Sequence, residues 1–220
     1  MSISVDVVSD VICPWCFLGK RRLDKAIASM PETEVEVRWR PFLLDGSIPR
    51  EGMDRHTYLA NKFGEARLAS LHDPLIAAGK ADGVPFHFEA ITRTPNTLDA
   101  HRLIRWAQEA GRQHAMAERL FMDYWSEGKD VGETRVLIDA AIAVGLDGGL
   151  VNQLLASDAD RGPVIAEINQ AAEFGITGVP TFIVGNRYAV VGAQPPEVLK
   201  AAMTRAALEA RAAGRMRALY

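Results

Sequence analysis

The sequence predicts an α/β fold in which a β-α-β half and a β-β-α half flank a large all-α insertion. Three observations lead to this prediction. Residues 1–50 contain two strand-like runs around one helical run, residues 51–174 repeat apolar side chains at helical spacing, and residues 175–220 return to strand character before a last helix. We therefore expect a discontinuous α/β domain, formed by residues 1–50 and 175–220, and a helical insertion domain over residues 51–174.

The first half places one helix between two strands. Residues 3–8 are rich in β-branched side chains, as in a buried strand, and residues 34–42 alternate polar with apolar side chains. Residues 18–29 gather their apolar side chains toward one helix face. Pro14 suits the first turn of this helix, because a missing N–H costs little there.

The second half follows the helical block. Residues 180–184 and 188–191 have the apolar, β-branched character of strands, and Gly185-Asn-Arg187 between them predicts a tight hairpin. Pro195-Pro-Glu197 then opens a last helix that extends to about residue 212.

Composition limits the function and the partners. The 220 residues are 48% hydrophobic and carry a formal net charge of −3, so nothing suggests a nucleic-acid or anionic-membrane partner. No apolar run approaches the roughly 20 residues that span a bilayer, and the first ten residues do not resemble a signal peptide. We expect a cytoplasmic protein, with a homodimer as one possible assembly.

The two cysteines of the chain, Cys13 and Cys16, are separated by Pro14 and Trp15. They supply only half of a zinc site, which needs about four protein ligands, and the histidines lack a spacing that would complete it, so we expect no metal. A disulfide between residues this close would close too small a loop to stabilise the fold much. A redox pair at a helix N-terminus has a mechanism, since unpaired N–H groups and the helix dipole stabilise a thiolate there.

We therefore expect Cys13 to be the nucleophile and Cys16 the resolving thiol. A Cys-x-x-Cys pair in a β-α-β unit is typical of a thioredoxin-like redox motif. A second signature lies in Gly178-Val-Pro-Thr181, where Pro180 precedes a strand without joining its ladder, so that a turn or a cis bond is expected. A thioredoxin-like fold would place Pro180 opposite the cysteines and leave the backbone of Val179 to pair with substrate.

Five further side chains are candidates for the site, each with a purely structural alternative. Pro14 and Trp15 can contact substrate or merely cover the end of the helix. Asp10 can assist proton transfer from Cys16 or serve as a turn or capping residue. The last two, Asn96 and His101, fall at the start of a predicted helix, where Asn96 can be a helix cap and His101 a buried helical histidine.

Three motifs in this order resemble the DsbA-family oxidoreductases of the FrnE-like branch: residues 9–19, residues 96–103 and residues 175–182. The resemblance spans nearly the whole chain. It implies a thioredoxin-like fold with a helical insertion, a cis Val179–Pro180 bond and a thiol–disulfide oxidoreductase that reduces, oxidises or isomerises disulfides of protein or small-molecule substrates. In this family the helix that carries Asn96 and His101 lines the cleft. The cysteines carry the electrons, so no prosthetic group is expected.

Two alternatives stay open. The same superfamily contains glutathione-dependent 2-hydroxychromene-2-carboxylate isomerases and kappa-class glutathione transferases, which typically carry serine where this chain has Cys13. Their Ser-Asp pair for glutathione aligns with Gly192-Ala-Gln194 here. Both departures weigh against this alternative and leave glutathione as a possible co-substrate. The second alternative is a chaperone or redox sensor that holds clients in its cleft.

Overall fold

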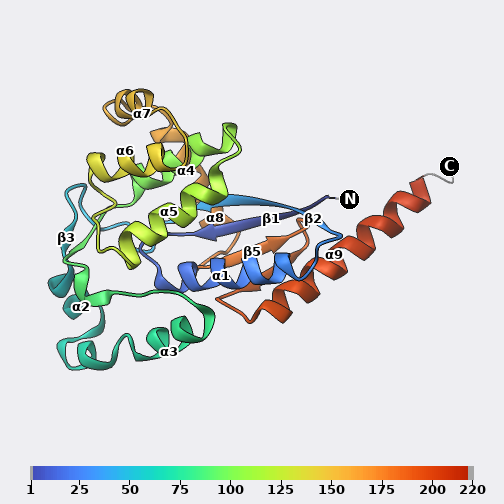
Figure 1. Cartoon of the computed structure of the whole chain (residues 1–220), viewed down its shortest axis with the longest axis horizontal. Helices are drawn as coiled ribbons and strands as arrows, with labels where there is room; N and C mark the ends of the chain where they lie inside the picture. The colour runs from blue at the N-terminus through green and yellow to red at the C-terminus, as the bar shows by residue number, and fades with distance from the viewer. Residues whose placement is uncertain (1, 218–220) are drawn as a thin grey trace.

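A four-stranded sheet forms the centre of the molecule. The computed structural model describes residues 2–217, and side-chain environments for residues 2–212. The strand order is β2-β1-β5-β6 (Figure 1). β1 (Ser2–Ser9) pairs in parallel with β2 (Glu34–Pro41), and it pairs antiparallel with β5 (Thr181–Val184), which continues through a hairpin into β6 (Tyr188–Val191). The predicted α/β fold and its two flanking halves are confirmed, although residues 218–220 of the second half lie outside the described part.

Two helices cover one side of this sheet. α1 (Pro14–Ala28) and α9 (Pro196–Arg217) contact each other, and α9 also packs against β1, β5 and β6 (Figure 1). Val5 and Val7 of β1 are buried, as are Phe182 and Val184 of β5. Side chains two apart on a strand share a face, so these residues form one apolar layer.

The residues between the two halves are mainly helical, and they pack onto the sheet. α4, α5 and α8 contact β2, so that the sheet and the helices share one continuous hydrophobic core. The elements of this block are α2 (Arg55–Phe63), η1 (Glu65–Ser70), α3 (Asp73–Asp82), η2 (Phe88–Ala90), α4 (Leu98–Glu109), α5 (Gln113–Trp125), α6 (Thr134–Ala143), α7 (Gly148–Leu155) and α8 (Arg161–Glu173).

The block also contains one feature that helical spacing does not predict. β3 (Met53–Asp54) and β4 (Arg93–Thr94) form a small antiparallel pair. Two residues in each strand are too few to produce an alternating pattern in the sequence. The pairing joins the start of α2 to the segment before α4.

Ion pairs hold α3 against α1. Asp82 at the end of α3 accepts from Arg22 at 2.7 Å and from Lys25 at 2.8 Å. These contacts hold the end of α3 against the C-terminal half of α1. Residues of α2 and Leu75 of α3 line the cavity of the candidate site. No helix within residues 2–217 has both the length and the apolar composition to cross a membrane.

Candidate active site

Cys13 occupies the N-terminal end of α1. It precedes Pro14, the first helical residue, with an extended backbone (φ −95°, ψ 111°). Its carbonyl oxygen accepts from the N–H groups of Cys16 at 3.0 Å and Phe17 at 3.4 Å. The positive end of the α1 helix dipole therefore lies at Cys13.

The loop before β5 faces Cys13. The Cys13 thiol donates to the carbonyl oxygen of Val179 at 3.5 Å, and the Val179–Pro180 peptide bond is cis. Gly19 permits this close approach of the loop to α1. A Cβ atom at residue 19 would lie 2.9 Å from Cγ of Pro180 and 3.1 Å from Cζ of Phe182.

Cys16 lies one helical turn deeper and is buried. Burial raises the pKa of the Cys16 thiol well above its usual range. The neighbouring Cys13 and the negative charge of Asp10 raise it further, and a hydrogen bond from the backbone of Asp10 acts in the opposite direction. The two thiols therefore have different environments, and Cys16 stays protonated until a base removes its proton.

Asp10 and His101 form a buried polar contact beside the cysteines. Oδ2 of Asp10 accepts from the N–H of Leu44 at 2.7 Å, and Oδ1 lies 3.4 Å from Nε2 of His101. The same Nε2 lies 3.0 Å from the carbonyl oxygen of Phe42. These contacts fix the Asp10 carboxylate between the cysteine segment and the segment that follows β2.

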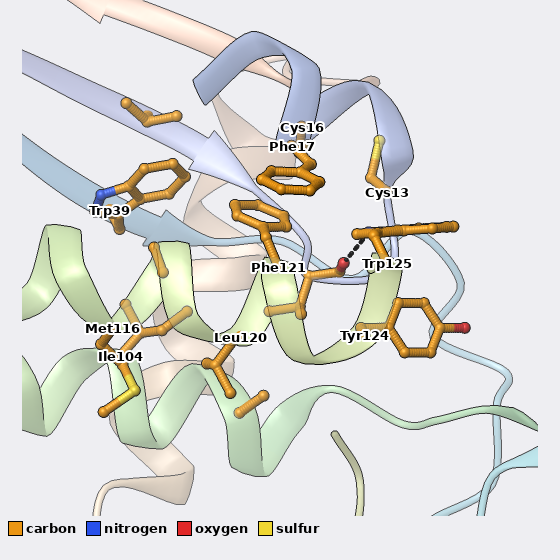
Figure 2. Close-up of a cluster of buried hydrophobic side chains, with 14 of the residues drawn as sticks. Cys13, Cys16, Phe17, Trp39, Ile104, Met116, Leu120, Phe121, Tyr124 and Trp125 are labelled. Atoms are coloured by element: carbon orange, nitrogen blue, oxygen red, sulfur yellow. Dashed lines mark hydrogen bonds between the residues drawn. The ribbon is translucent and has the colours of Figure 1, made fainter. Parts of the chain in front are cut away.

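Cys13 lines a cavity of about 410 Å³. Trp125 of α5 lines this cavity. Its Nε1 donates to the carbonyl oxygen of Val11 at 2.9 Å (Figure 2). The cavity is mostly apolar and aromatic, and its lining residues are Ile12, Cys13, Pro14, Trp15, Leu44, Arg55, Tyr58, Leu59, Lys62, Phe63, Leu71, His72, Leu75, Thr94, Trp125 and Val179. Cavities of this size and composition commonly bind small molecules.

The structure brings only some of the candidate residues to this cavity. Pro14, Trp15 and Val179 line it with Cys13, and Trp15 is 40% exposed. Asn96 does not line it, because its Nδ2 donates to the carbonyl oxygen of Ile48 at 2.8 Å and its Oδ1 accepts from the N–H of Leu98. Asn96 thus has the contacts of a helix-start residue, one of the two alternatives that the sequence left open.

His101 also lies away from the cavity. Its side chain is buried, and it contacts Asp10 and Phe42 instead. The sequence did not indicate the contact between His101 and Asp10, because the two residues are ninety-one positions apart and share no motif.

Several residues that form the cavity carried no sequence signal. Arg55, Tyr58 and Lys62 come from α2, Thr94 from β4 and Trp125 from α5. Each reads in the sequence as an ordinary helix, strand or core residue, and only the tertiary packing, with α3 and α5 against α1 and α2 against β3 and β4, brings them together. Within residues 2–217, no group of three or more His, Cys, Asp or Glu side chains is arranged to hold a metal ion.

The sheet order, the helical insertion and the cysteine pair at the start of α1 define a thioredoxin-like protein. Residues 4–204 match the family model of the DSBA-like thioredoxin domain. The chain therefore belongs to the DsbA-like family, and the resemblance seen in the three motifs is confirmed at the level of that family.

Individual relatives agree with this assignment. The chain is 28% identical over 206 residues to the uncharacterized protein YwbO of Bacillus subtilis, covering 93% of this chain and 97% of the relative. The probable DsbA oxidoreductase SCO1869 from Streptomyces coelicolor is 34% identical, with a TM-score of 0.85 over 93% of this chain and 89% of that one. A 2-hydroxychromene-2-carboxylate isomerase shares the fold, with 19% identity and a TM-score of 0.73 over 94% and 98% of the two chains.

Proposed function

We propose that this protein is a thiol–disulfide oxidoreductase in which Cys13 is the nucleophile and Cys16 the resolving thiol. The observation that carries the proposal is the difference between the two cysteines. Both cysteines are buried, but Cys13 lines the cavity at the N-terminal end of α1, whereas Cys16 does not line it and has a raised pKa. An incoming disulfide in the cavity therefore meets Cys13.

The exchange has two steps. The Cys13 thiolate attacks one sulfur of the substrate disulfide, the substrate S–S bond breaks, and the first thiolate leaves with the electron pair. Cys16 then loses its proton, attacks Sγ of Cys13 and releases the second thiolate. The protein is left with a Cys13–Cys16 disulfide, and two electrons have passed to the substrate. A thiol or dithiol reductant, glutathione among them, would restore the reduced pair.

Asp10 is the base that we assign to the second step. Its carboxylate is fully buried and close enough to Cys16 for its charge to raise the pKa of that thiol. A buried carboxylate whose oxygens are held by Leu44 and His101 is preorganised to accept a proton as the Cys16 thiolate forms. Pro14, Trp15 and Val179 line the cavity with Cys13 and form the substrate contact, and Pro180 follows Val179 through the cis bond.

We propose that the reaction takes place in the cytoplasm and runs toward reduction of substrate disulfides. The chain has no cysteine besides the exchange pair, and a close pair of thiols in a reducing compartment is more often catalytic than structural. A reduction potential near that of cytosolic reductants, about −270 mV, would support this direction, and one near about −120 mV would make the protein an oxidant.

Two variants test the function. Cys13→Ser should abolish disulfide reduction in an insulin-reduction assay, because no other thiol lines the cavity in the described part of the chain. Cys16→Ser should accumulate a mixed disulfide with substrate, detectable by mass spectrometry. Full activity of Cys13→Ser would rule out the proposed mechanism.

The glutathione-dependent isomerase or transferase is the second candidate. It is favoured by the fold shared with the 2-hydroxychromene-2-carboxylate isomerase. Cys13 occupies the position at which those enzymes typically carry serine. Turnover of an aromatic substrate by the Cys16→Ser variant in the presence of glutathione, without disulfide exchange, would favour this candidate.

A further inference from the structure

Arg55 is a buried cation at the cavity that contains Cys13. It opens α2, its residue is only 7% exposed, and no described carboxylate forms an ion pair with it. Its Nη1 donates to the hydroxyl of Tyr124 at 3.1 Å, the one side-chain hydrogen bond that it makes among the described residues. A buried charge without a partner is costly, so such a charge is normally neutralised by an ion pair or a ligand.

The neighbours of Arg55 do not neutralise it. Its guanidinium lies over the rings of Tyr124, at 5.9 Å, and Trp125, at 5.3 Å, contacts that stabilise a cation without cancelling its charge. Burial, with the Arg55 charge acting in the same direction, lowers the pKa of His72, so this imidazole is neutral near pH 7.

The cavity as a whole favours an anion. Its lining includes two permanent cations, Arg55 and Lys62, and none of the carboxylates among the described residues. Lys62 is already engaged, since its Nζ donates to the hydroxyl of Tyr58 at 2.7 Å and to Asp45 at 3.3 Å. Carboxylates do line the neighbouring hollow on the other side of Arg55, but none of them is within ion-pairing distance of it.

A second polar group in the cavity also lacks a partner. Thr94 is 1% exposed and lines the same cavity, and its Oγ1 has no hydrogen bond of good geometry within the described range, although it lies near enough to the Tyr124 hydroxyl to lower the pKa of that group. Buried hydroxyls are normally satisfied, and an unsatisfied one costs about 1–3 kcal/mol. The unpartnered hydroxyl of Thr94 and the unpaired guanidinium of Arg55 together form a small polar subsite in an otherwise apolar cavity.

We propose that this cavity selects small disulfides whose thiol half has an aromatic or apolar body and a carboxylate, with the carboxylate bound by Arg55 and Thr94. The proposal rests on the thiol–disulfide function proposed above and names its substrate class. Trp125, Tyr58 and Leu75 contact the apolar body, and Cys13 attacks the sulfur. After that attack, one half leaves as a thiolate, and the half joined to Cys13 stays in the cavity until Cys16 releases it.

A pair of reporter disulfides tests the proposal. Dithiobis(nitrobenzoate) carries a carboxylate on each aromatic ring, and dithiodipyridine is an aromatic disulfide without one. Pre-reduced protein is mixed with each in a single turnover, and release of the coloured thiolate gives a rate constant. The measured quantity is the rate constant for the anionic disulfide divided by that for the neutral one, which cancels the intrinsic reactivity of each protein variant.

Arg55→Met should lower this ratio by about tenfold to a hundredfold, the range expected for losing a charge-assisted hydrogen bond. Arg55→Lys, which keeps the charge but not the planar fork, should give an intermediate ratio. Arg135→Met is the matched control, because Arg135 is exposed on α6 and does not line the cavity, and its ratio should equal that of the unmodified protein.

The outcomes distinguish failure of the proposed function from failure of the carboxylate subsite alone. If the unmodified protein reduces neither disulfide faster than a free thiol does, the proposed function fails. If it reduces both and Arg55→Met leaves the ratio unchanged, exchange stands, and Arg55 is only a structural cation held on Tyr124 and Trp125. Because Arg55→Met can weaken that packing, circular dichroism of each variant accompanies the rates. Arg55→Gln is a second neutral variant that keeps a donor toward Tyr124, and a folded Arg55→Gln with an unchanged ratio also overturns the carboxylate subsite.

Discussion

His101 lies with its Nε2 atom 3.4 Å from Oδ1 of Asp10 and 3.0 Å from the carbonyl oxygen of Phe42. Both side chains are buried, and His101 comes from α4. A carbonyl oxygen can only accept, so the imidazole donates to Phe42 from Nε2, and the same atom lies beside the Asp10 carboxylate. The Asp10 carboxylate is thereby fixed next to Cys16, whose proton must leave in the second step of exchange.

Asp10→Asn should slow the second step of exchange by about a hundredfold, within the usual range for loss of a general base. The change also removes a negative charge that raises the pKa of Cys16, and this effect alone would make the Cys16 thiolate form more readily. The two roles of Asp10 therefore predict opposite changes in the rate of the second step: loss of the base slows it, and loss of the charge speeds it. Stopped-flow release of the second thiolate, measured across pH, distinguishes them.

Asp139→Asn is the matched control for this measurement. It removes the same charge from the exposed surface of α6, where Asp139 pairs with Arg135. Faster release of the second thiolate in Asp10→Asn than in this control would show that Asp10 acts through its charge and not as a base.

His101→Ala should lower the free energy of unfolding by about 1–3 kcal/mol, because the part-buried carbonyl of Phe42 loses its donor. His101→Gln keeps a donor and should lose less. If His101 positions Asp10, His101→Ala should also slow release of the second thiolate, and combination with Asp10→Asn should add little further slowing. Urea unfolding measures the first effect and stopped-flow the second; additive slowing in the double variant would mean that the two residues act separately.

The difference between the thiols should appear in their alkylation rates. Burial raises the pKa of Cys16, so at neutral pH the Cys13→Ser variant should react with iodoacetamide at least about tenfold more slowly than the Cys16→Ser variant. The rate for Cys13→Ser should rise as the pH increases toward the raised pKa. In denaturant both variants should react at the same rate. Equal rates in the folded state would remove the basis for assigning Cys16 as the resolving thiol.

Gly19→Ala should lower the free energy of unfolding by about 1–3 kcal/mol, the usual cost of overpacking. Its Cβ would meet Pro180 at 2.9 Å and push the loop that carries Val179 away from Cys13. Gly46→Ala places a methyl group where no atom lies within 4 Å, and surface changes of this kind usually stay within about 0.5 kcal/mol. Chemical denaturation compares the two, and equal stabilities would show that the Gly19 contact relaxes without cost.

Much of the fold was predictable because its elements carry strong local signals. β-branched runs marked β1 and β5, alternation marked β2, and Gly185-Asn-Arg187 marked the hairpin, where Gly185 (φ 59°) and Asn186 (φ 55°) adopt the left-handed conformation that these residue types favour. The two-residue pairing of β3 with β4 was not predictable, since a ladder this short leaves no periodicity.

The sequence by itself determined the chemistry: two cysteines one helical turn apart, a proline that opens their helix, and a distant Val-Pro before a strand. Only the tertiary structure decided which partners each group has. It placed Val179 against Cys13 and His101 against Asp10, and it left Arg55, among the described residues, without a carboxylate partner at the cavity. The physical reason is that local propensity acts over a few residues, whereas burial, unpaired charge and the shape of a cavity depend on how helices far apart in the chain pack together.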